Sequence, residues 1–485
     1  MENEVKKPNY FLIGIMMAGT LVTFLNSSSL NIALPLIMVD LNIEHYSTIQ
    51  WLTTINMLIS GVLIPTTAFF ITKFKSHHIY MAAMSLFTVG SLFAFIAPNF
   101  ALLLIARILQ AAATAILMPL LMNVQLASFS KEERGKAMGM FGMIYMLAPA
   151  LSPLIAGSIM NHFDWRGVFL LITILAAIPL VISFFKLENI LPQRETSMEY
   201  VSLVFSSIGF TALLLGLGNV EVHGWISFQT GGLIAIGAAS LAIFAIRQFK
   251  VETPLLDLNV YRYSMFALAS AIAVVNALLI YAPMIIMPFY LQNIRGYTPL
   301  MSGLIPMPGT ILLAFAMPVT GALYDKIGAR SMAVIGFILV TFGNFALSRL
   351  TMDTTTIYVV LSLMTRSVGF ALVIMPLQTN GLNQLPARLN AAGAAVNSTV
   401  QQVAGAIGIA LFITLKTGSI AANLPDATTY TTEAFEVASR QVNLDAINFI
   451  FLVSVGISLV ALSLSFFIKK VVVEHEPEAE SPTKA

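Results

Sequence analysis

The sequence predicts an all-α integral membrane protein, in which two six-helix bundles are joined by two further transmembrane helices. Three observations lead to this fold class. First, 58% of the 485 residues are hydrophobic and only 10% are charged, an apolar fraction beyond what a soluble domain buries. Second, the apolar residues gather in runs long enough to cross a bilayer. Third, two motifs of the first half recur in the second.

Fourteen apolar runs are candidate spans, because a helix of about 20 residues crosses the hydrocarbon of a bilayer. In order along the chain they are 11–37, 49–71, 79–97, 100–124, 137–160, 167–186, 200–219, 229–247, 265–291, 300–324, 331–349, 356–378, 391–415 and 446–468. The connections are short except for 187–199 and 416–445. For the second we expect a flexible polar loop, with a small ordered cap outside the membrane as the alternative.

Positively charged residues predict the orientation of the spans. With the N-terminus in the cytoplasm, 18 of the 25 lysines and arginines fall in cytoplasmic segments, five fall in external segments and two lie within spans. Cytoplasmic connections of membrane proteins carry such an excess of positive charge. We therefore expect both termini in the cytoplasm, with residues 473–485 forming a charged, disordered tail.

An internal repeat divides the chain. The segment PTTAFFITKF from Pro65 is matched 253 residues later by PVTGALYDKI from Pro318, and RILQAAATAILMP from Arg107 is matched 259 residues later by RSVGFALVIMP from Arg366. We assign residues 1–190 and 263–472 to two six-helix bundles and residues 191–262 to two inserted helices. Parallel halves with a binding site between them at the midplane are an architecture of secondary transporters. The alternative is chance similarity between apolar segments.

Five motifs resemble those of a known family. GALYDKIGAR, Gly321–Arg330, resembles a loop motif of the major facilitator superfamily, and ARILQAAATA, with Arg107 and Gln110, resembles its fourth-span motif. LAPALSPLIAG, Leu147–Gly157, is similar to the fifth-span motif of its exporters. LNIALPLIMVDL in the first span and NSTVQQVAGAIG in the thirteenth resemble motifs of the fourteen-span drug:proton antiporters, the EmrB/QacA type. The resemblance implies the major facilitator fold and proton-coupled export of small amphiphilic compounds.

The loop motif is expected to act as a conformational latch. Its residues Gly321, Asp325, Lys326, Gly328 and Arg330 end the tenth span at the cytoplasmic surface. The Asp325 carboxylate can pair with a basic residue or a helix N-terminus in one conformation and release it in another. The alternative is a solvated turn. The first-half copy has Ala68 and Thr72 in place of the glycine and aspartate, so the latch is either shifted to Asp325 or weakened.

The fifth span combines prolines with small residues. Pro149 and Pro153 each delete a backbone hydrogen bond, which is expected to bend the helix. Ala148, Ser152, Ala156 and Gly157 form a small-residue ridge on which another helix can approach closely. A bent and tightly docked fifth span suits an exporter whose outer gate must close, although simple helix packing produces the same pattern.

Two arginines within spans are the first candidates for a functional site. A guanidinium in hydrocarbon costs at least ~2.5–3.5 kcal/mol, so it faces a cavity, water or a partner. The resemblance implies a part for Arg107 in proton coupling or substrate binding, and bracing of helices through carbonyls is the alternative. The residues expected to line the substrate cavity are Asn26, Ser29, Asn31, Arg107, Gln110, Arg366, Asn397 and Gln401. Hydrogen bonds between helices are the alternative role for the amides and hydroxyls.

Acidic residues are absent from the interiors of the predicted spans. All 23 lie in connections, in the tail or at span ends, and the six histidines lie in connections or the tail. Relatives commonly carry an acid near the position of Asn26, where it serves as proton acceptor. We therefore expect the cavity to accept neutral or anionic amphiphiles better than cations. The proton-coupling candidates are Arg107, Asp40, Glu44, Glu221 and Asp325, unless the substrate itself carries the proton.

The sequence thus predicts a secondary active exporter of amphiphilic drugs or toxic compounds, working by alternating access. A dedicated exporter or flippase of a lipid or secreted metabolite is the main alternative, and a non-transporting membrane sensor is another. The chain has no cysteine, no clustered catalytic residues and no phosphate-binding GxxxxGK loop. We expect no enzyme activity, no cofactor or metal and no nucleic-acid partner, and a monomer in the plasma membrane of a bacterium.

Overall fold

The regular structure is helical throughout the part of the chain that the computed structural model describes. These residues are 9–43, 46–130, 133–160, 162–193, 195, 197–423 and 432–469. Of the predicted site residues, Glu44 lies outside these ranges, and the side chains of Pro153, Glu221 and Asp325 lie outside the description as well.

The first six spans form the N-terminal half. Its helices are α1 (Tyr10–Asp40), α2 (Tyr46–Leu63), the 3-10 turn η1 (Ile64–Thr66), α3 (Thr67–Lys73), α4 (Ser76–Phe95), α5 (Phe100–Ser128), α6 (Arg134–Met160) and α7 (Arg166–Lys186). The second predicted span is interrupted at Pro65, where η1 separates α2 from α3. Proline lacks the N–H that an uninterrupted helix needs at this position.

The inserted pair and the C-terminal half follow. The pair consists of α8 (Tyr200–His223), the π-helical turn η2 (Phe228–Gly232) and α9 (Leu233–Gln248). After η3 (Leu258–Arg262), the second half contains α10 (Ser264–Phe289), η4 (Tyr290–Ile294), α11 (Pro299–Leu304), α12 (Met307–Ile327), α13 (Ala329–Leu347), α14 (Thr356–Asn383), η5 (Ala387–Leu389), α15 (Asn390–Asn423) and α16 (Thr432–Ser465).

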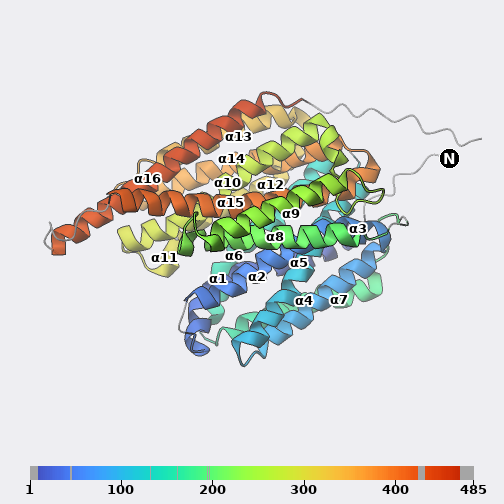
Figure 1. The fold of residues 1–485 in the computed structure, drawn as a ribbon, viewed down its shortest axis with the longest axis horizontal. Coiled ribbons are helices and arrows are strands. Elements are labelled where there is room, and N and C mark those ends of the chain that lie inside the picture. The colour runs from blue at the N-terminus through green and yellow to red at the C-terminus, as the bar shows by residue number, and fades with distance from the viewer. Residues whose placement is uncertain are drawn as a thin grey trace, which may run out of the picture.

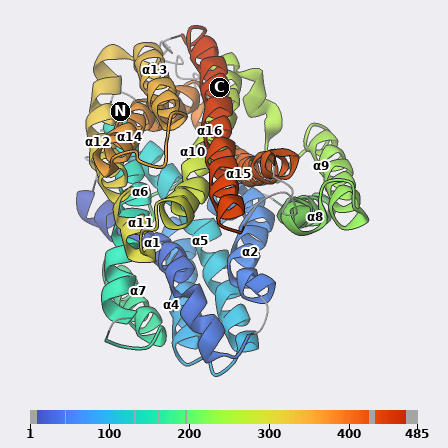
Figure 2. The same cartoon turned by 90° about the vertical axis from the view of Figure 1, so that its left-hand side faces the viewer.

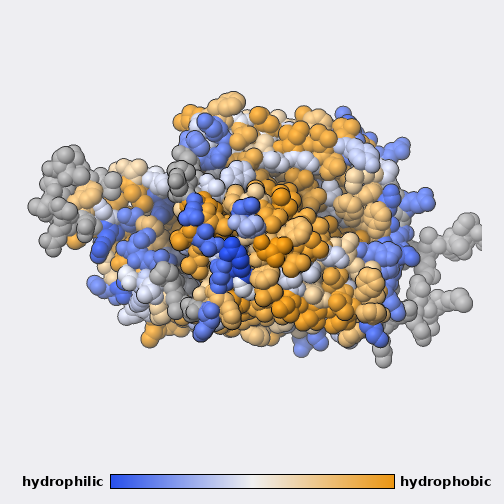
Figure 3. Space-filling view, turned by 90° about the horizontal axis from the view of Figure 1, so that it is seen from below, coloured by the Kyte–Doolittle hydropathy of each residue, from blue (hydrophilic) through white to orange (hydrophobic). Residues whose placement is uncertain are grey.

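Every predicted span corresponds to a helix. Thirteen helical segments among the described residues are long and apolar enough to cross a membrane, and α10, with its apolar stretch Ser264–Ile280, occupies the ninth predicted span. The chain enters α1 and leaves α16 at the same end of the bundle (Figure 1), as the even number of spans requires. Hydrophobic residues cover the middle of the face in Figure 3, with hydrophilic residues toward the two ends.

The prediction of a flexible loop over 416–445 is wrong. Helix α15 continues to Asn423 and α16 begins at Thr432, so most of this segment is helical. The start of α16 is amphipathic. Leu444 and Ile447 are buried against the second half, whereas Gln441 and Asp445, one turn apart, form a hydrogen bond on the surface. The two helices therefore extend beyond the apolar runs by which the sequence defined them.

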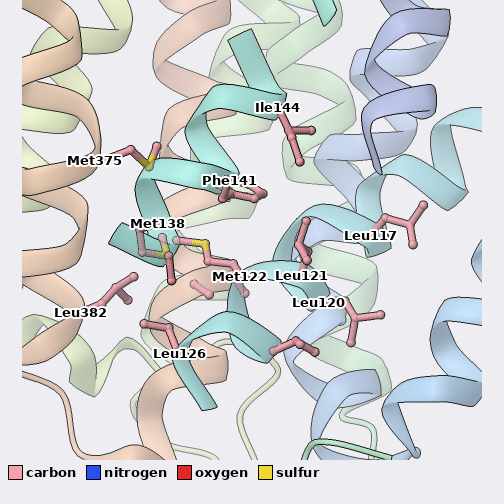
Figure 4. Packing of buried hydrophobic residues seen from close by; sticks show 14 of the residues in the cluster. Leu117, Leu120, Leu121, Met122, Leu126, Met138, Phe141, Ile144, Met375 and Leu382 are labelled. Carbon is pink, nitrogen blue, oxygen red and sulfur yellow. The ribbon is translucent and has the colours of Figure 1, made fainter. Parts of the chain in front are cut away.

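The buried apolar residues show which side of the protein is closed. One cluster joins the halves, and Figure 4 shows Met122 of α5 and Met138 of α6 facing Met375 and Leu382 of α14. Toward the external ends there are two separate clusters, one built only from residues 30–169 and one from residues 286–457. In the predicted orientation, the halves are packed together at the cytoplasmic side, whereas toward the outside each half has a buried cluster of its own.

Glycines make the cytoplasmic contact close. A Cβ atom on Gly321 of α12 would overlap the carbonyl oxygen of Gly135 on α6, and one on Gly139 would overlap the carbonyl oxygen of Met317. Gly135 and Gly139 are one turn apart, the small-residue spacing that lets membrane helices approach backbone to backbone. The crossing of α6 and α12 thus holds the two halves together.

Candidate functional site

A buried network of polar side chains connects four helices of the N-terminal half. Gln110 of α5 accepts a hydrogen bond from Arg107 Nη1 at 2.7 Å and one from Asn26 Nδ2 of α1 at 2.9 Å, both on Oε1. Its own Nε2 donates to Ser91 Oγ of α4 at 3.1 Å. Arg107 Nε donates to the carbonyl oxygen of Leu52 on α2 at 3.2 Å. Arg107 and Asn26 are only 1% exposed, so the network is sealed within the helices.

The guanidinium of Arg107 is therefore held by neutral groups. Among the described residues no ion pair involves it, and the sequence places no carboxylate in the surrounding span interiors. The hydrogen bonds that Arg107 donates to a carbonyl oxygen and to an amide oxygen do not cancel its charge. In this conformation Arg107 braces α2 against α5, the role that the sequence left as the alternative to substrate contact.

Several polar atoms close to this network have no hydrogen-bond partner among the described residues. They are Asn26 Oδ1, Ser29 Oγ and Asn56 Nδ2, and all three are buried. An unsatisfied buried polar group costs about 1–3 kcal/mol, so such atoms are places where water or a polar part of a ligand binds favourably. Asn31 lies one turn further out, is exposed, and accepts a hydrogen bond from Thr53 of α2 at 3.2 Å.

Neutral groups also hold Arg366 in the C-terminal half. Its Nε donates to Asn344 Oδ1 of α13 at 2.9 Å, its Nη2 donates to the carbonyl oxygen of Leu279 on α10, and the guanidinium lies 4.5 Å from the Phe370 ring centroid. The side chain is 7% exposed. Arg366 thus has neutral partners of the same kinds as Arg107, although it lacks the neighbouring glutamine.

The remaining predicted cavity residues lie on α15. Asn397 is buried and its Nδ2 has no hydrogen-bond partner among the described residues, while Gln401, one turn later, is half-buried. The structure does not bring these two residues into the hydrogen-bonded network of Asn26, Arg107 and Gln110. A contribution to the same cavity remains a proposal.

Asp40 joins two helices at the external surface. Its carboxylate accepts hydrogen bonds from Trp165 Nε1 at 3.1 Å and from Arg166 Nη1 at 2.8 Å, and Arg166 also pairs with Asp164 at 2.6 Å. Asp40 therefore links the end of α1 to the start of α7. For the other acidic candidates, Glu44, Glu221 and Asp325, the structure provides no description of the side chain.

The loop motif lies where α12 ends at the cytoplasmic surface. Gly328 has φ +78°, a left-handed conformation that favours glycine and that ends the helix. Lys326 and Arg330 are exposed on either side of it. Gly321 is the point of contact with α6 described above, so this glycine is required by the close approach of two backbones.

The cytoplasmic closure also has polar connections that sequence reasoning missed. Arg134 at the start of α6 donates to Leu126 O at 2.7 Å and to Asn383 Oδ1 of α14 at 3.3 Å. Asn383 Nδ2 in turn donates to the hydroxyl of Tyr324 on α12 at 3.4 Å. The spacing of Gly135 and Gly139 was a signal for this crossing, but nothing in the sequence identified Asn383 as the partner.

The small-residue ridge of the fifth span packs against α1. Ser152 Oγ donates to the carbonyl oxygen of Leu25, next to Asn26, at 3.3 Å, and Ala148 and Ala156 are fully buried. The exception is Gly157, where a Cβ atom would meet nothing within 4 Å. Helix α6 is continuous through Pro149, which is exposed.

A further element of the repeat becomes visible in three dimensions. Gly90 and Ser91 of α4 lie against Gln110 of α5, and Gly343 and Asn344 of α13 lie against Arg366 of α14. The two glycines are 253 residues apart, which is the offset of the loop motif. Each glycine lets the neighbouring helix approach closely. The polar residue that follows it accepts a hydrogen bond, Ser91 from Gln110 and Asn344 from Arg366. This offset was the sequence signal for Ser91 and Asn344.

Comparison with known proteins agrees with this fold. The chain matches the Major Facilitator Superfamily model over residues 16–409. It is 38% identical over 416 residues to the uncharacterized MFS-type transporter YhcA of Bacillus subtilis (strain 168), covering 86% of this chain and 78% of that one. It is 32% identical over 467 residues to the lincomycin resistance protein LmrB of the same organism, covering 96% of each.

The fold is shared with a solved structure of distant sequence. The human organic anion transporter MFSD10 (TETRAN) aligns with a TM-score of 0.63 at 12% identity, covering 93% of this chain and 100% of that chain. The chain is thus a multi-pass transporter of small molecules and not an enzyme, and its bacterial relatives indicate the plasma membrane. It belongs to the Major Facilitator Superfamily and, within it, to the fourteen-span branch of the EmrB/QacA type that its motifs indicate.

Proposed function

We propose that the chain exports amphiphilic drugs or toxic compounds by proton-coupled antiport and alternating access. The observation that carries this proposal is the group of buried polar atoms on Asn26, Ser29 and Asn56 that lie beside the Arg107 network and have no hydrogen-bond partner among the described residues. The similarity to a lincomycin resistance protein supports a drug as substrate.

The charge of the interior favours neutral or anionic substrates. Two buried guanidinium groups face neutral partners, and the interiors of the predicted spans have no carboxylate. Hydrogen bonds to neutral groups leave the positive potential in place, and at low dielectric this potential acts over several ångströms. A lipophilic cation is repelled at this site, whereas a neutral or anionic amphiphile is not.

Flux measurements in proteoliposomes with an imposed pH gradient test the proposal. Matched cationic, neutral and anionic amphiphiles are loaded. We expect export of the neutral or anionic compounds, and we expect it to require the pH gradient. Equal export with and without the gradient overturns proton coupling. Export of a quaternary ammonium dye as fast as a neutral drug overturns the charge preference.

The proton acceptor is proposed to lie at a mouth of the cavity. The candidates are Asp40 and three acids whose side chains lie outside the description, Glu44, Glu221 and Asp325. Each is changed singly to its amide, and pH-driven flux is compared with flux driven by substrate concentration alone. We expect at least one variant to lose the pH-driven flux and keep the flux driven by substrate concentration. If all four variants keep both kinds of flux, the proton travels on the substrate.

A dedicated exporter or flippase of a lipid or secreted metabolite is the second candidate. The observation in its favour is the acid-free interior, which departs from what drug:proton antiporters commonly carry. Drug resistance conferred on a sensitive host supports the first proposal. An altered envelope lipid or secreted compound without resistance supports the second.

A further inference from the structure

The inserted helices lie across the boundary between the two halves. Figure 2 shows α8 and α9 beside the bundle, next to α2 of the N-terminal half and α15 of the C-terminal half. Helix α8 contacts both of them. When the halves of an alternating-access transporter rock against each other, α2 and α15 shift relative to one another. An element that lies on both must then slide over at least one of them.

The inserted pair is itself tightly built. Glu199 and Arg247 form an ion pair of 2.8 Å, and Gln248 Nε2 donates to Ser202 Oγ at 2.8 Å. A Cβ atom on Gly237 of α9 would lie 2.6 Å from the backbone nitrogen of Leu213 on α8, so the two backbones touch. The pair therefore moves as one unit.

Its attachment to α15 combines apolar burial with a hydrogen bond. Leu217 and Val220 of α8 form a buried cluster with Ala410 of α15. Just beyond the end of α8, Trp225 Nε1 donates to Thr414 Oγ1 on α15 at 2.8 Å. The first contact is apolar and the second is a directional hydrogen bond, and both lie in the external half of the membrane.

Its contact with α2 is apolar. Phe210 and Leu214 of α8 lie over Gly61, where a Cβ atom would be 3.5 Å from Phe210 Cβ and 2.8 Å from Leu214 Cδ1. No hydrogen bond joins α8 to α2 among the residues that the structure describes. A contact without a hydrogen bond resists sliding less than one that a hydrogen bond holds in place.

We propose that the inserted pair is a side wall of the transport path that moves with the C-terminal half and slides over α2 at Gly61. In this role it keeps the boundary between α2 and α15 covered toward the lipid while the halves move. The inference rests on the alternating access proposed above, but not on the charge of the substrate or on proton coupling.

Cross-linking tests the proposal directly, because the sequence contains no cysteine and every introduced thiol is unique. The pair Gly61→Cys and Phe210→Cys joins α2 to α8, and its 3.5 Å Cβ separation matches disulfide geometry. The pair Trp225→Cys and Thr414→Cys joins the inserted pair to α15 and is bridged by a short bifunctional maleimide. Flux of whichever compound the unmodified chain exports is measured before and after each cross-link.

We expect the Gly61–Phe210 disulfide to stop flux and reductant to restore it, while the Trp225–Thr414 bridge leaves more than half of the flux. Continued flux through the first cross-link overturns the proposal, and so does arrest by the second. Arrest by both shows that the pair slides on both halves.

Two controls accompany the test. The four single-cysteine variants, treated with the same oxidant or maleimide, show that chemistry alone does not stop flux. Gly142→Cys with Met375→Cys joins α6 to α14 across the cytoplasmic closure, where a Cβ on Gly142 lies 2.8 Å from Met375 Cγ, and provides the reference for complete arrest.

Discussion

Arg107 and Arg366 occupy corresponding places in the two halves, and each is held by a backbone carbonyl of one neighbouring helix and a side-chain amide. The carbonyls belong to Leu52 on α2 and Leu279 on α10. Neither arginine has an acidic partner among the described residues. The two buried charges thus have neutral partners of the same kinds, although these partners come from helices that do not correspond in the repeat.

Asn26→Asp is expected to admit cations. The new carboxylate has the shape of the amide and lies beside Gln110, which also binds the Arg107 guanidinium. Its charge offsets the positive potential of the site. We expect export of a quaternary ammonium dye to rise at least tenfold in proteoliposomes, while Asn26→Leu, a control of similar size without charge, shows no gain. Unchanged exclusion of the dye in Asn26→Asp would contradict the electrostatic account.

Gln110→Leu is expected to destabilise the N-terminal half. It removes the acceptor shared by Arg107 and Asn26 and leaves both donors buried. Each unsatisfied buried donor costs about 1–3 kcal/mol, so the unfolding midpoint in detergent should fall clearly. Thr114→Val is the matched control, because its hydroxyl bonds only to the backbone of its own helix. A midpoint for Gln110→Leu no lower than that of the control would show that the network is not stabilising.

Gly139→Ala is expected to open the cytoplasmic side. The added methyl group overlaps the carbonyl oxygen of Met317, and overpacking of this kind costs about 1–3 kcal/mol. A thiol placed at the buried Leu382 by Leu382→Cys should then react faster with a water-soluble maleimide. Gly157→Ala on the same helix meets nothing within 4 Å and should leave the rate unchanged. Equal rates of maleimide reaction in Gly139→Ala and Gly157→Ala would show that the contact at Gly139 does not close the cytoplasmic side.

The ion pair between Glu199 and Arg247 makes the inserted helices sensitive to acid. Burial opposes ionisation of Glu199, but hydrogen bonds from Ser202 and Arg247 outweigh it and hold its pKa below the usual 4.5. A lowered carboxyl pKa contributes stability that is present above the unfolded-state pKa and is lost as pH falls through the folded-state pKa.

The measurement compares unfolding midpoints of the unmodified chain and Glu199→Gln from pH 7 to pH 3. The unmodified chain should be the more stable at pH 7, and the difference should shrink below about pH 4.5. If the difference in unfolding midpoint grew on acidification, the pKa of Glu199 would be raised in the folded protein and not lowered.

Much of the fold is predictable from local sequence. The spans follow from the length of apolar runs, and the helix end at Gly328 follows from the conformational freedom of glycine. The break at Pro65 does not follow from proline alone, since α6 continues through Pro149. The helical extension of α16 from Thr432 was missed because a count of apolar residues does not detect an amphipathic helix outside the membrane. The partner of Arg107 on another helix, the carbonyl oxygen of Leu52 on α2, was also not predictable, since it lies 55 residues away along the chain.

By itself the sequence determined the fourteen spans, their repeat, the family and the absence of acids from the span interiors. The tertiary structure decided that Arg107 bonds to neutral groups, that α6 and α12 close the cytoplasmic side at Gly139 and Gly321, and that α8 lies on both α2 and α15. The physical reason is that lipid is as apolar as the interior, so the apolar pattern of a span does not reveal which of its faces meets another helix. That choice depends on small residues and buried hydrogen bonds, whose partners are set only when the helices pack.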